Sequence, residues 1–472
     1  MSHEIRADYN QRYLFPPSLE DLVAADHPAR FIREFVDSVN LTEMGFKVRG
    51  SEEGRPNYAA DLLLKVWLYG FFEKIRSTRG LEKACRQHIA LMWLTGLHYP
   101  DHSSLWRFWR DNRKALKQVF RKTIQVAIKS QLVDMVLHAV DGTKLAARSS
   151  TREMWQKQKL EKTLGRLDEL LSRMMREVEE GQDPGCEEYR LPEGLQEKVK
   201  LQQTIRAKLA ELESEEREQM HADEREAQVM KMPEGKKLGY NAQVVVDSKA
   251  TIIVAADVTT DQNDKFQLIP MIEAVEETVG SAAQETVADS GYLSGEQLAK
   301  AEQRQTEVLV SLKELETQEQ RGGEFHSSKF VYDKERDCWI CPVGEALTLQ
   351  GTSKSCHKRY AVRTYRCRSF KQCPVRWQCS QDKQGRKLAV TPHHDVVLRQ
   401  KEKQQDQQKR ELIKKRMGIV EPVFAWIKQL MGFRRWTVCG LEKVKAQWAL
   451  LCAVVNLSKM YPRWAAGQLA IS

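Results

Sequence analysis

The apolar residues of the first 130 positions are spaced as they are in helices. The densest run extends from Ala59 to Ile75 and predicts a buried helix. Another helix is expected from Ser103, because this serine follows a turn and is a good N-cap. We therefore predict an all-α N-terminal domain over residues 1–130.

Short β-prone runs and turn signals follow this helical part. The apolar run from Leu132 meets Asp141 and Gly142, which predicts a buried strand that ends at an acid. Two β-rich runs joined by the turn at 247–250 predict a hairpin, and Thr286–Ala288 predicts a strand followed by Asp289. A helix precedes that strand, and Val308–Ser311 is expected to be the fifth strand. The predicted class is α/β, with a mixed sheet built from residues 131–150 and 236–312.

A heptad pattern lies between the two parts of this sheet. Its seam contains Leu160, Leu164, Leu167, Leu171, Met174 and Val178. A turn-rich linker leads to a second apolar seam, from Val199 to Leu212, which is interrupted at Gln202. We expect an antiparallel helical hairpin inserted at residues 151–235, and the alternative is a seam that dimerises between subunits.

Three acids are candidates for a metal site: Asp141, Asp289 and Glu421. Asp141 and Asp289 each follow a predicted strand, and ligand sites in open α/β sheets lie beyond the carboxyl ends of the strands. Glu421 and Lys428 are about two helical turns apart, so they share one helix face. Clustered carboxylates repel one another unless a divalent cation lies between them, and Mg²⁺ prefers oxygen ligands. A pair of such ions suits in-line phosphoryl transfer. The alternative for Asp141-Gly142 is a simple turn.

Other acids are weaker candidates for this site. Asp247 lies in the predicted turn, and Asp257 lies inside a strand. Asp261 and Asp264 lie in a polar loop before a helix. We assign none of them to the site.

A cysteine-rich segment at residues 313–398 separates the fifth strand from the C-terminal helices. Cys338 and Cys341 have the spacing of a zinc knuckle, whereas the later cysteines are spaced more loosely. The preferred Zn²⁺ ligand set, with Cys338 as a substitute, is Cys341, Cys367, Cys373 and Cys379. The alternative is free cysteines in an irregular insertion. Tyr365 and Trp377 suit stacking on DNA.

The net charge of the 472-residue chain is +10, which favours a polyanionic partner. The helix expected after Ser103 carries Arg107, Arg110 and Arg113, which could contact phosphates along one face or form a solvated basic face. The chain contains no apolar run long enough to span a membrane and no secretory segment at its start, so a cytoplasmic location is expected. The ten cysteines are therefore expected to be thiols or metal ligands.

The segments AVDGTKLAARSS, TVADSGYLS and VEPVFAWIKQLMGFRRW resemble the three acidic motifs of DDE transposases of bacterial insertion sequences. The resemblance is closest to the IS1182 group, which is related to the IS4/IS5-type enzymes, and it covers nearly the whole chain. It implies an RNase H-like catalytic core with Asp141, Asp289 and Glu421 as the Mg²⁺-binding catalytic triad, with Mn²⁺ as a substitute. It also implies that residues 399–472 form the core's C-terminal helices.

Around the glutamate, related enzymes carry a tyrosine, an arginine, the glutamate and a lysine at fixed spacings. This chain keeps Glu421 and Lys428, but Met417 stands at the arginine position and Lys414 at the tyrosine position. Arg416 is the neighbouring candidate for the arginine.

The resemblance implies cleavage of DNA at the ends of a transposable element and transfer of the freed strand into target DNA. The expected DNA contacts are Arg107, Arg110, Arg113, Arg416, Lys428, Arg434 and Arg435. The partners that the resemblance implies for this protein are the terminal inverted repeats and the target DNA. A homodimer is expected to bind them in the nucleoid. The alternatives are a non-catalytic DNA-binding protein of the same fold and an RNase H-like nuclease without strand transfer.

Overall fold

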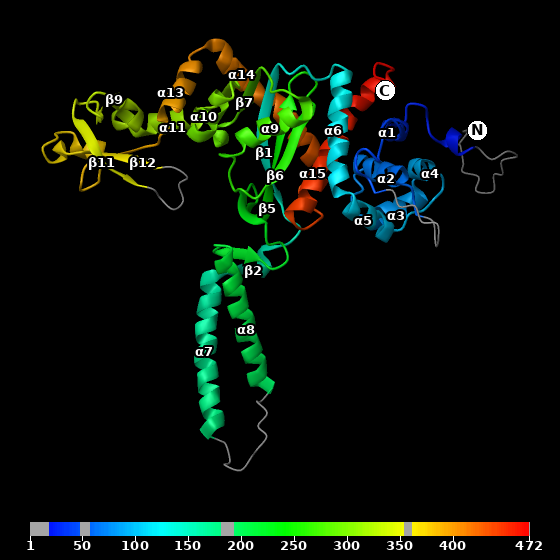
Figure 1. Cartoon of the computed structure of the whole chain (residues 1–472), viewed down its shortest axis with the longest axis horizontal. Coiled ribbons are helices and arrows are strands. Elements are labelled where there is room, and N and C mark those ends of the chain that lie inside the picture. Colours follow the sequence, from blue (N-terminus) through cyan, green and yellow to red (C-terminus); the bar gives the residue numbers. More distant parts are fainter. Residues whose placement is uncertain (1–17, 48–56, 181–192, 354–360, 472) are drawn as a thin grey trace, which may run out of the picture.

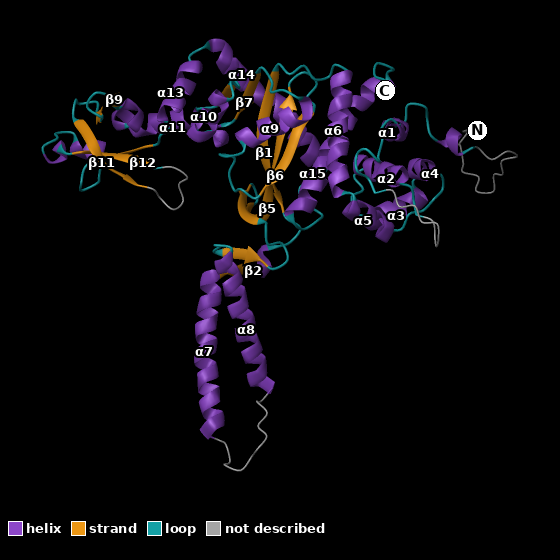
Figure 2. Ribbon diagram, viewed as in Figure 1, coloured by secondary structure: helices purple, strands orange, loops and turns teal. Residues whose placement is uncertain are grey.

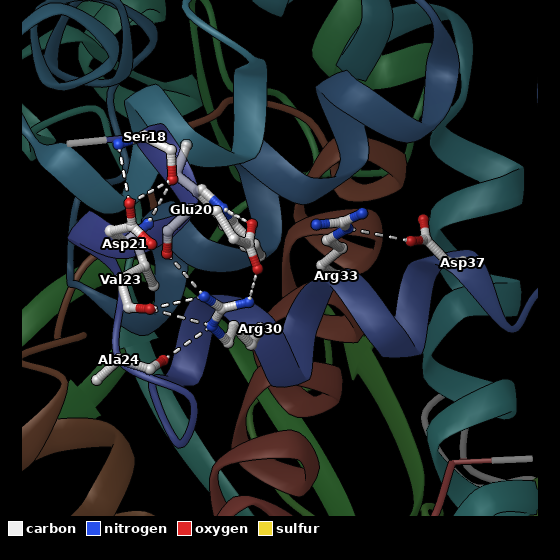
Figure 3. A network of polar contacts seen from close by, with 9 residues as sticks. Ser18, Glu20, Asp21, Val23, Ala24, Arg30, Arg33 and Asp37 are labelled. Carbon is white, nitrogen blue, oxygen red and sulfur yellow. Dashed lines mark hydrogen bonds and ion pairs between the residues drawn. The ribbon is translucent and has the colours of Figure 1, made fainter. Parts of the chain in front are cut away.

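The computed structural model describes residues 18–47, 57–180, 193–353 and 361–471 (Figure 1). Its N-terminal part is helical, as predicted. After the 3₁₀ turn Leu19–Leu22 come α1 (Pro28–Asp37), α2 (Ala60–Phe72), α3 (Thr78–Gln87), α4 (Ile89–Thr95), α5 (His102–Asp111) and α6 (Arg113–Lys129). Helix α2 lies within the densest apolar run and is buried along most of its length. The segment before α1 is held by Arg30, which donates to the backbone oxygens of Val23 and Ala24 and pairs with Glu20 (Figure 3).

Two details of the basic helix differ from the prediction. The N-cap of α5 is Asp101, whose carboxylate accepts the N–H of Ser104 (2.9 Å), so the helix begins before Ser103. The helix ends at Asp111, and Arg113 begins α6. Asn112 separates the two helices because its side chain donates to the carbonyl of Phe108 and accepts the N–H of Lys47, from outside both helices.

The central sheet is mixed and contains six strands (Figure 2). They are β1 (Leu137–Ala146), β4 (Gln228–Met232), β5 (Gly235–Asp247), β6 (Ile253–Thr259), β7 (Glu285–Ala288) and β8 (Val308–Val310). β5 pairs antiparallel with β1, β4 and β6, whereas β7 is parallel to both β1 and β8. The predicted hairpin and fifth strand are confirmed. β4 lies before residue 236, where we expected the core to resume, because it pairs with the first residues of β5.

The prediction that the first strand ends at Asp141 is wrong. β1 continues through Asp141 and Gly142 to Ala146, because the long strand β5 pairs with it as far as Gly239. The Asp-Gly signal is therefore not a turn here, and Asp141 lies inside the strand.

Helices surround this sheet and join it to the N-terminal part. They are α9 (Leu268–Val279), α10 (Gly295–Gln303), α13 (His394–Lys403), α14 (Gln407–Ala425) and α15 (Leu441–Ala465). Asn456 of α15 bonds to both backbone groups of Ile253 in β6 and to the hydroxyl of Thr123 in α6. One continuous hydrophobic core therefore contains the N-terminal helices and the sheet. Within the described residues, no helix is long and apolar enough to cross a membrane.

Pro422 lies inside α14. A π-helical segment, Trp426–Leu430, follows α14 directly. It winds less per residue than an α-helix, and the predicted common face of Glu421 and Lys428 is therefore not that of a continuous α-helix.

Two units project from the core (Figure 1). The first is a helical hairpin of α7 (Lys157–Glu180) and α8 (Glu193–Ser214), joined to the core by β2 (Met154–Gln156) and β3 (Gln219–His221). Leu167 and Leu171 of α7 pack against Ile205 and Leu209 of α8, so the seam is closed within one chain. Gln202, which interrupts the seam, donates to Asp168.

The second unit is a five-stranded antiparallel sheet in the cysteine-rich segment. After α11 (Lys313–Gly322) come β9 (Val331–Asp333), β10 (Cys338–Ile340), β11 (Ala346–Ser353), β12 (Val362–Cys367), the short helix α12 (Arg376–Cys379) and β13 (Lys387–Val390). The unit has its own hydrophobic cluster around Trp339 and Leu347. The segment is therefore not irregular.

Candidate active site

The register of β1 and β7 brings the first two acids together. Val140 is paired with Ala288 in the parallel ladder, and the next residues are Asp141 and Asp289. β7 ends at Ala288, whereas β1 continues. The two acids therefore lie side by side where one strand ends beside the other.

Asp141 is half-buried and forms an ion pair with Arg416. Its Oδ2 lies 2.6 Å from the Nη1 of Arg416 in α14, and its Oδ1 accepts the N–H of Gly142 (2.8 Å). Burial raises the pKa of Asp141 to about 6; Arg416 opposes this shift, and the charge of Asp289 adds to it. The structure therefore leaves a net cost for keeping this carboxylate charged.

Asp289 has the same kind of environment. It caps the 3₁₀ turn Ser290–Tyr292, and its Oδ1 accepts the N–H of Gly291 (2.9 Å). Burial raises the pKa of Asp289, Arg416 lowers it, and Asp264 raises it. Arg416 thus compensates both acids from one position on α14.

The third predicted acid lies apart from this pair. Glu421 is exposed on α14, five residues beyond Arg416, which points into the site. Lys428 is half-buried, and burial lowers its pKa while the charge of Asp141 raises it. The structure thus brings together Asp141, Asp289, Arg416 and Lys428. In the described parts of the chain, no three His, Cys, Asp or Glu side chains are grouped closely enough to hold a metal ion.

The two arginines after the π-helical segment border the far end of β1. Arg435 donates to the carbonyl of Ala147 (2.9 Å), and Arg434 donates to that of Lys428 (3.2 Å). Both side chains remain exposed, whereas Trp436 is buried in the core. In the N-terminal domain, Arg107 and Arg110 are exposed on α5, and Arg110 pairs with Asp111.

A polar network that the sequence did not predict lies next to the acids. Asp264, at the loop before α9, accepts from the side-chain amides of Asn241 and Gln243, each at 2.7 Å. The hydroxyl of Tyr292 donates to the amide oxygen of Gln243. Asn241 and Gln243 are inward-facing polar residues two apart on a strand, and this alternation is the sequence signal that could have identified the network.

Three of the other acids make structural contacts: Asp247, Asp257 and Asp261. Asp247 accepts the N–H groups of Met135 (3.1 Å) and Lys249 (3.0 Å). Asp257 pairs with Lys445 of α15, and Asp261 accepts from Gln267. These contacts agree with the prediction that these three acids are not part of the metal site.

The predicted zinc ligands Cys341, Cys367, Cys373 and Cys379 lie near one another in the cysteine-rich unit. Cys341, Cys367 and Cys379 contact the same hydrophobic cluster, and buried Cys338 is outside it. Burial raises the pKa of Cys367, and neighbouring Cys341 and Cys373 raise it further. Cys356 and His357 lie outside the described residues. Tyr365 is buried and donates to Asp337, so its predicted stacking on DNA is wrong, whereas Trp377 is 71% exposed.

Two family models match the chain. One, described as a transposase DDE domain, matches residues 340–461 and includes Glu421 and Lys428. The other, described as a transposase domain (DUF772), matches residues 17–111 in the N-terminal helices. Among curated proteins, no relative matches this chain. The pairing of these two domains is typical of IS1182-family transposases, and the DDE domain implies the RNase H-like core. The chain therefore carries the DDE domain of transposases, enzymes that cut DNA and join it to a target.

Proposed function

We propose that this transposase cleaves DNA at the ends of its own element with divalent metal ions and joins the freed 3′ hydroxyl to target DNA. The observation that carries the proposal is the register that sets Asp141 beside Asp289. Two half-buried carboxylates with raised pKa values form a donor set that suits Mg²⁺ or Mn²⁺. When bound, such ions activate the attacking oxygen and stabilise the leaving 3′ oxygen.

The chain's own residues have distinct roles in this proposal. Asp141 and Asp289 would hold the metal, and Arg416 would have to release the Oδ2 of Asp141 for that oxygen to serve as a ligand. Glu421 completes the catalytic triad after α14 or its side chain moves toward the pair. Lys428, Arg434 and Arg435 contact the DNA backbone near the scissile phosphate, because they lie on the segment that follows Glu421.

The other DNA contacts come from the N-terminal helices, where Arg107, Arg110 and Arg113 lie across the junction of α5 and α6. These arginines hold the terminal repeats through their phosphates. The active form on DNA is a homodimer. The domain limits given by the sequence, at residues 130, 150, 312 and 398, divide the chain by these roles, whereas the limit at 235 moves to before β4, which belongs to the central sheet.

The cysteine-rich unit is proposed to hold a structural Zn²⁺ through Cys341, Cys367, Cys373 and Cys379. The N–H of Glu345 donates to the Sγ of Cys341 (3.2 Å), and the N–H of Ser369 bonds to Cys367. Such N–H groups stabilise thiolates. Elemental analysis of the native chain should give about one zinc per chain, and Cys367→Ser should lose it. A zinc-free native chain would contradict this assignment.

The central experiment uses a labelled duplex with the repeats that flank the coding sequence, a target plasmid and Mg²⁺. The native chain should cut the duplex and join it to the plasmid, whereas Asp289→Asn should bind the duplex without cutting it. Binding without cutting by both proteins, with Mn²⁺ also ineffective, would favour a non-catalytic DNA-binding protein. Cutting without joining would favour a nuclease.

A further inference from the structure

The face of α7 that points away from the hairpin seam is strongly basic. The hairpin projects from the core, and its apolar seam is closed against α8 (Figure 1). Away from the seam, positions spaced alternately by three and four residues form a second row along α7. Five exposed cations in this row, which we call the basic stripe, are Lys159, Lys162, Arg166, Arg173 and Arg176. The remaining position of the row is exposed Glu169.

The hairpin directs its acids elsewhere. Asp168 faces α8, where Gln202 and Arg206 contact it. The ion pairs formed by the described residues of the hairpin use cations outside the basic stripe, among them Lys157 and Arg206. The positive charge of the stripe is therefore not balanced by the seam or by α8.

This distribution of charge is unfavourable for a helix that only faces water. Lys162 follows Lys159 by three residues and precedes Arg166 by four. Like charges at these two spacings repel one another on a helix surface and destabilise it. An anionic partner along the stripe would remove this repulsion.

The second helix of the hairpin shows that solvation does not require such a stripe. The exposed charges of α8 are mixed in sign, with Glu197 and Glu213 as well as Lys200 and Arg206. Both helices lie in the same arm and cover the same seam. The difference between them therefore indicates a function for the basic face of α7.

The base of the arm is fixed to the core beside the far end of β1. The Oε2 of buried Glu224 accepts the N–H of Ser149 (3.0 Å), and Glu226 accepts the backbone N–H at the start of α15. Arg435, a proposed DNA contact near the scissile phosphate, donates to the carbonyl of Ala147 (2.9 Å). The arm is therefore anchored next to a segment that is proposed to contact DNA.

We propose that the basic stripe of α7 binds target DNA through its phosphates. The stripe extends over about 25 Å of helix, most of the length of one turn of duplex. Contacts with phosphates carry no sequence information, which suits a target better than terminal repeats that must be recognised by sequence. The inference rests on the proposed function, because a target duplex is needed only for strand transfer.

The test measures binding of a labelled duplex without the terminal repeats, by fluorescence anisotropy in EDTA at several salt concentrations. The α7 variant is Arg166→Gln with Arg173→Gln. Its matched control is Lys200→Gln with Arg206→Gln, which removes the same charge from exposed positions of α8. The α7 variant should bind at least about tenfold more weakly near 0.1 M salt, and its slope of log affinity against log salt should fall by about two. The control should bind like the native chain.

Three outcomes of this test would overturn the inference. Equal weakening by the two variants would mean that total charge alone explains the binding, and native affinity of the α7 variant would mean that the stripe does not bind DNA. A larger loss on a duplex that contains the terminal repeats than on the repeat-free duplex would exclude target DNA as the partner. Circular dichroism should show the same helix content in all three proteins, because the changed residues are exposed.

A second measurement uses only the native chain. An amine-reactive reagent is applied with and without the repeat-free duplex, and the modified lysines are identified by mass spectrometry. The duplex should protect Lys159 and Lys162 several-fold, whereas exposed Lys200 should react equally in both samples. Equal reaction of Lys159 and Lys162 in both samples would contradict the inference.

These binding measurements need neither metal nor cleavage, so their result is separate from that of the proposed function. A native chain that binds DNA through the stripe but cuts no element ends would contradict the proposed function alone. In a native chain that cuts and joins, the α7 variant should lower joining by a larger factor than end cleavage. Equal losses of joining and cleavage would contradict the role of the stripe in binding the target.

Discussion

Two kinds of aspartate are found at the central sheet: Asp247, which is paired with His138 of β1 in the strand register, and the half-buried pair Asp141 and Asp289. His138 faces Asp247, whose Oδ2 lies 3.4 Å from the Nε2 of the histidine. Burial favours a raised pKa for Asp247, but the contacts with His138 and with the N–H groups of Lys249 and Met135 lower it. At Asp141 and Asp289 the balance is reversed, and burial raises both pKa values.

The difference shows which carboxylates receive enough hydrogen-bond donors from the protein to be stable as anions. Asp247 receives enough donors to be stable as an anion, so its charge stabilises the native state. Asp141 and Asp289 receive fewer donors, and a single guanidinium opposes the burial cost at both. Acids that the fold leaves incompletely compensated are candidates for binding a cation or a substrate.

The largest expected effect is on catalytic activity, and it concerns the incompletely compensated acids. Asp289→Asn should lower the rate of end cleavage by at least about 1000-fold, because a neutral amide is a poor metal ligand. It should leave DNA binding intact, since Asn can still accept the N–H of Gly291. Gel-based cleavage and band-shift assays measure the two properties. Loss of DNA binding would show that Asp289 has a structural role.

The sequence predicted the strands that carry these acids because alternating β-prone runs and turn signals are local properties. It did not predict the end of β1, since pairing with β5 outweighs the local Asp-Gly signal. The break at Asn112 was missed for the same kind of reason, because a contact with the backbone of Lys47 stabilises it.

The composition of the site depended still more on distant contacts. Asp141 and Asp289 could be proposed from their positions after apolar runs, but Arg416 at Asp141 and Asp264 at Gly142 are known only from the fold. The small sheet was missed because three of its five strands have only three or four residues, too few to show an alternating pattern.

The second expected effect concerns stability. Asp247→Ala should lower the free energy of unfolding by about 3 kcal/mol, because it leaves His138 and several backbone N–H groups without their acceptor. Denaturant titration measures this change. Asp257→Ala is the control: its partly exposed pair with Lys445 should contribute less than about 1 kcal/mol. Equal losses in the two variants would remove the distinction between Asp247 and an ordinary paired acid.

The smallest expected effect is a difference in pH dependence between the two kinds of acid. In the native state the pKa of Asp141 is about 6, above its ordinary value of 3.8, so the native chain binds more protons than the unfolded chain between these values. The free energy of unfolding of the metal-free protein should therefore fall by about 2 kcal/mol, because of this group, as the pH rises from about 4 to about 6.

Asp247 should act in the opposite direction, because its pKa is lowered in the native state: its contribution is present above its ordinary pKa and is lost as the pH falls. Urea titrations of native chain and Asp141→Asn in EDTA, from pH 4 to pH 7, isolate the first effect. The stability of the variant relative to the native chain should increase over this range, because it lacks the carboxyl that loses a proton. A constant difference across the range would mean that the Asp141 carboxyl titrates alike in the folded and unfolded chain, and that Arg416 compensates its burial as completely as His138 and the backbone compensate Asp247.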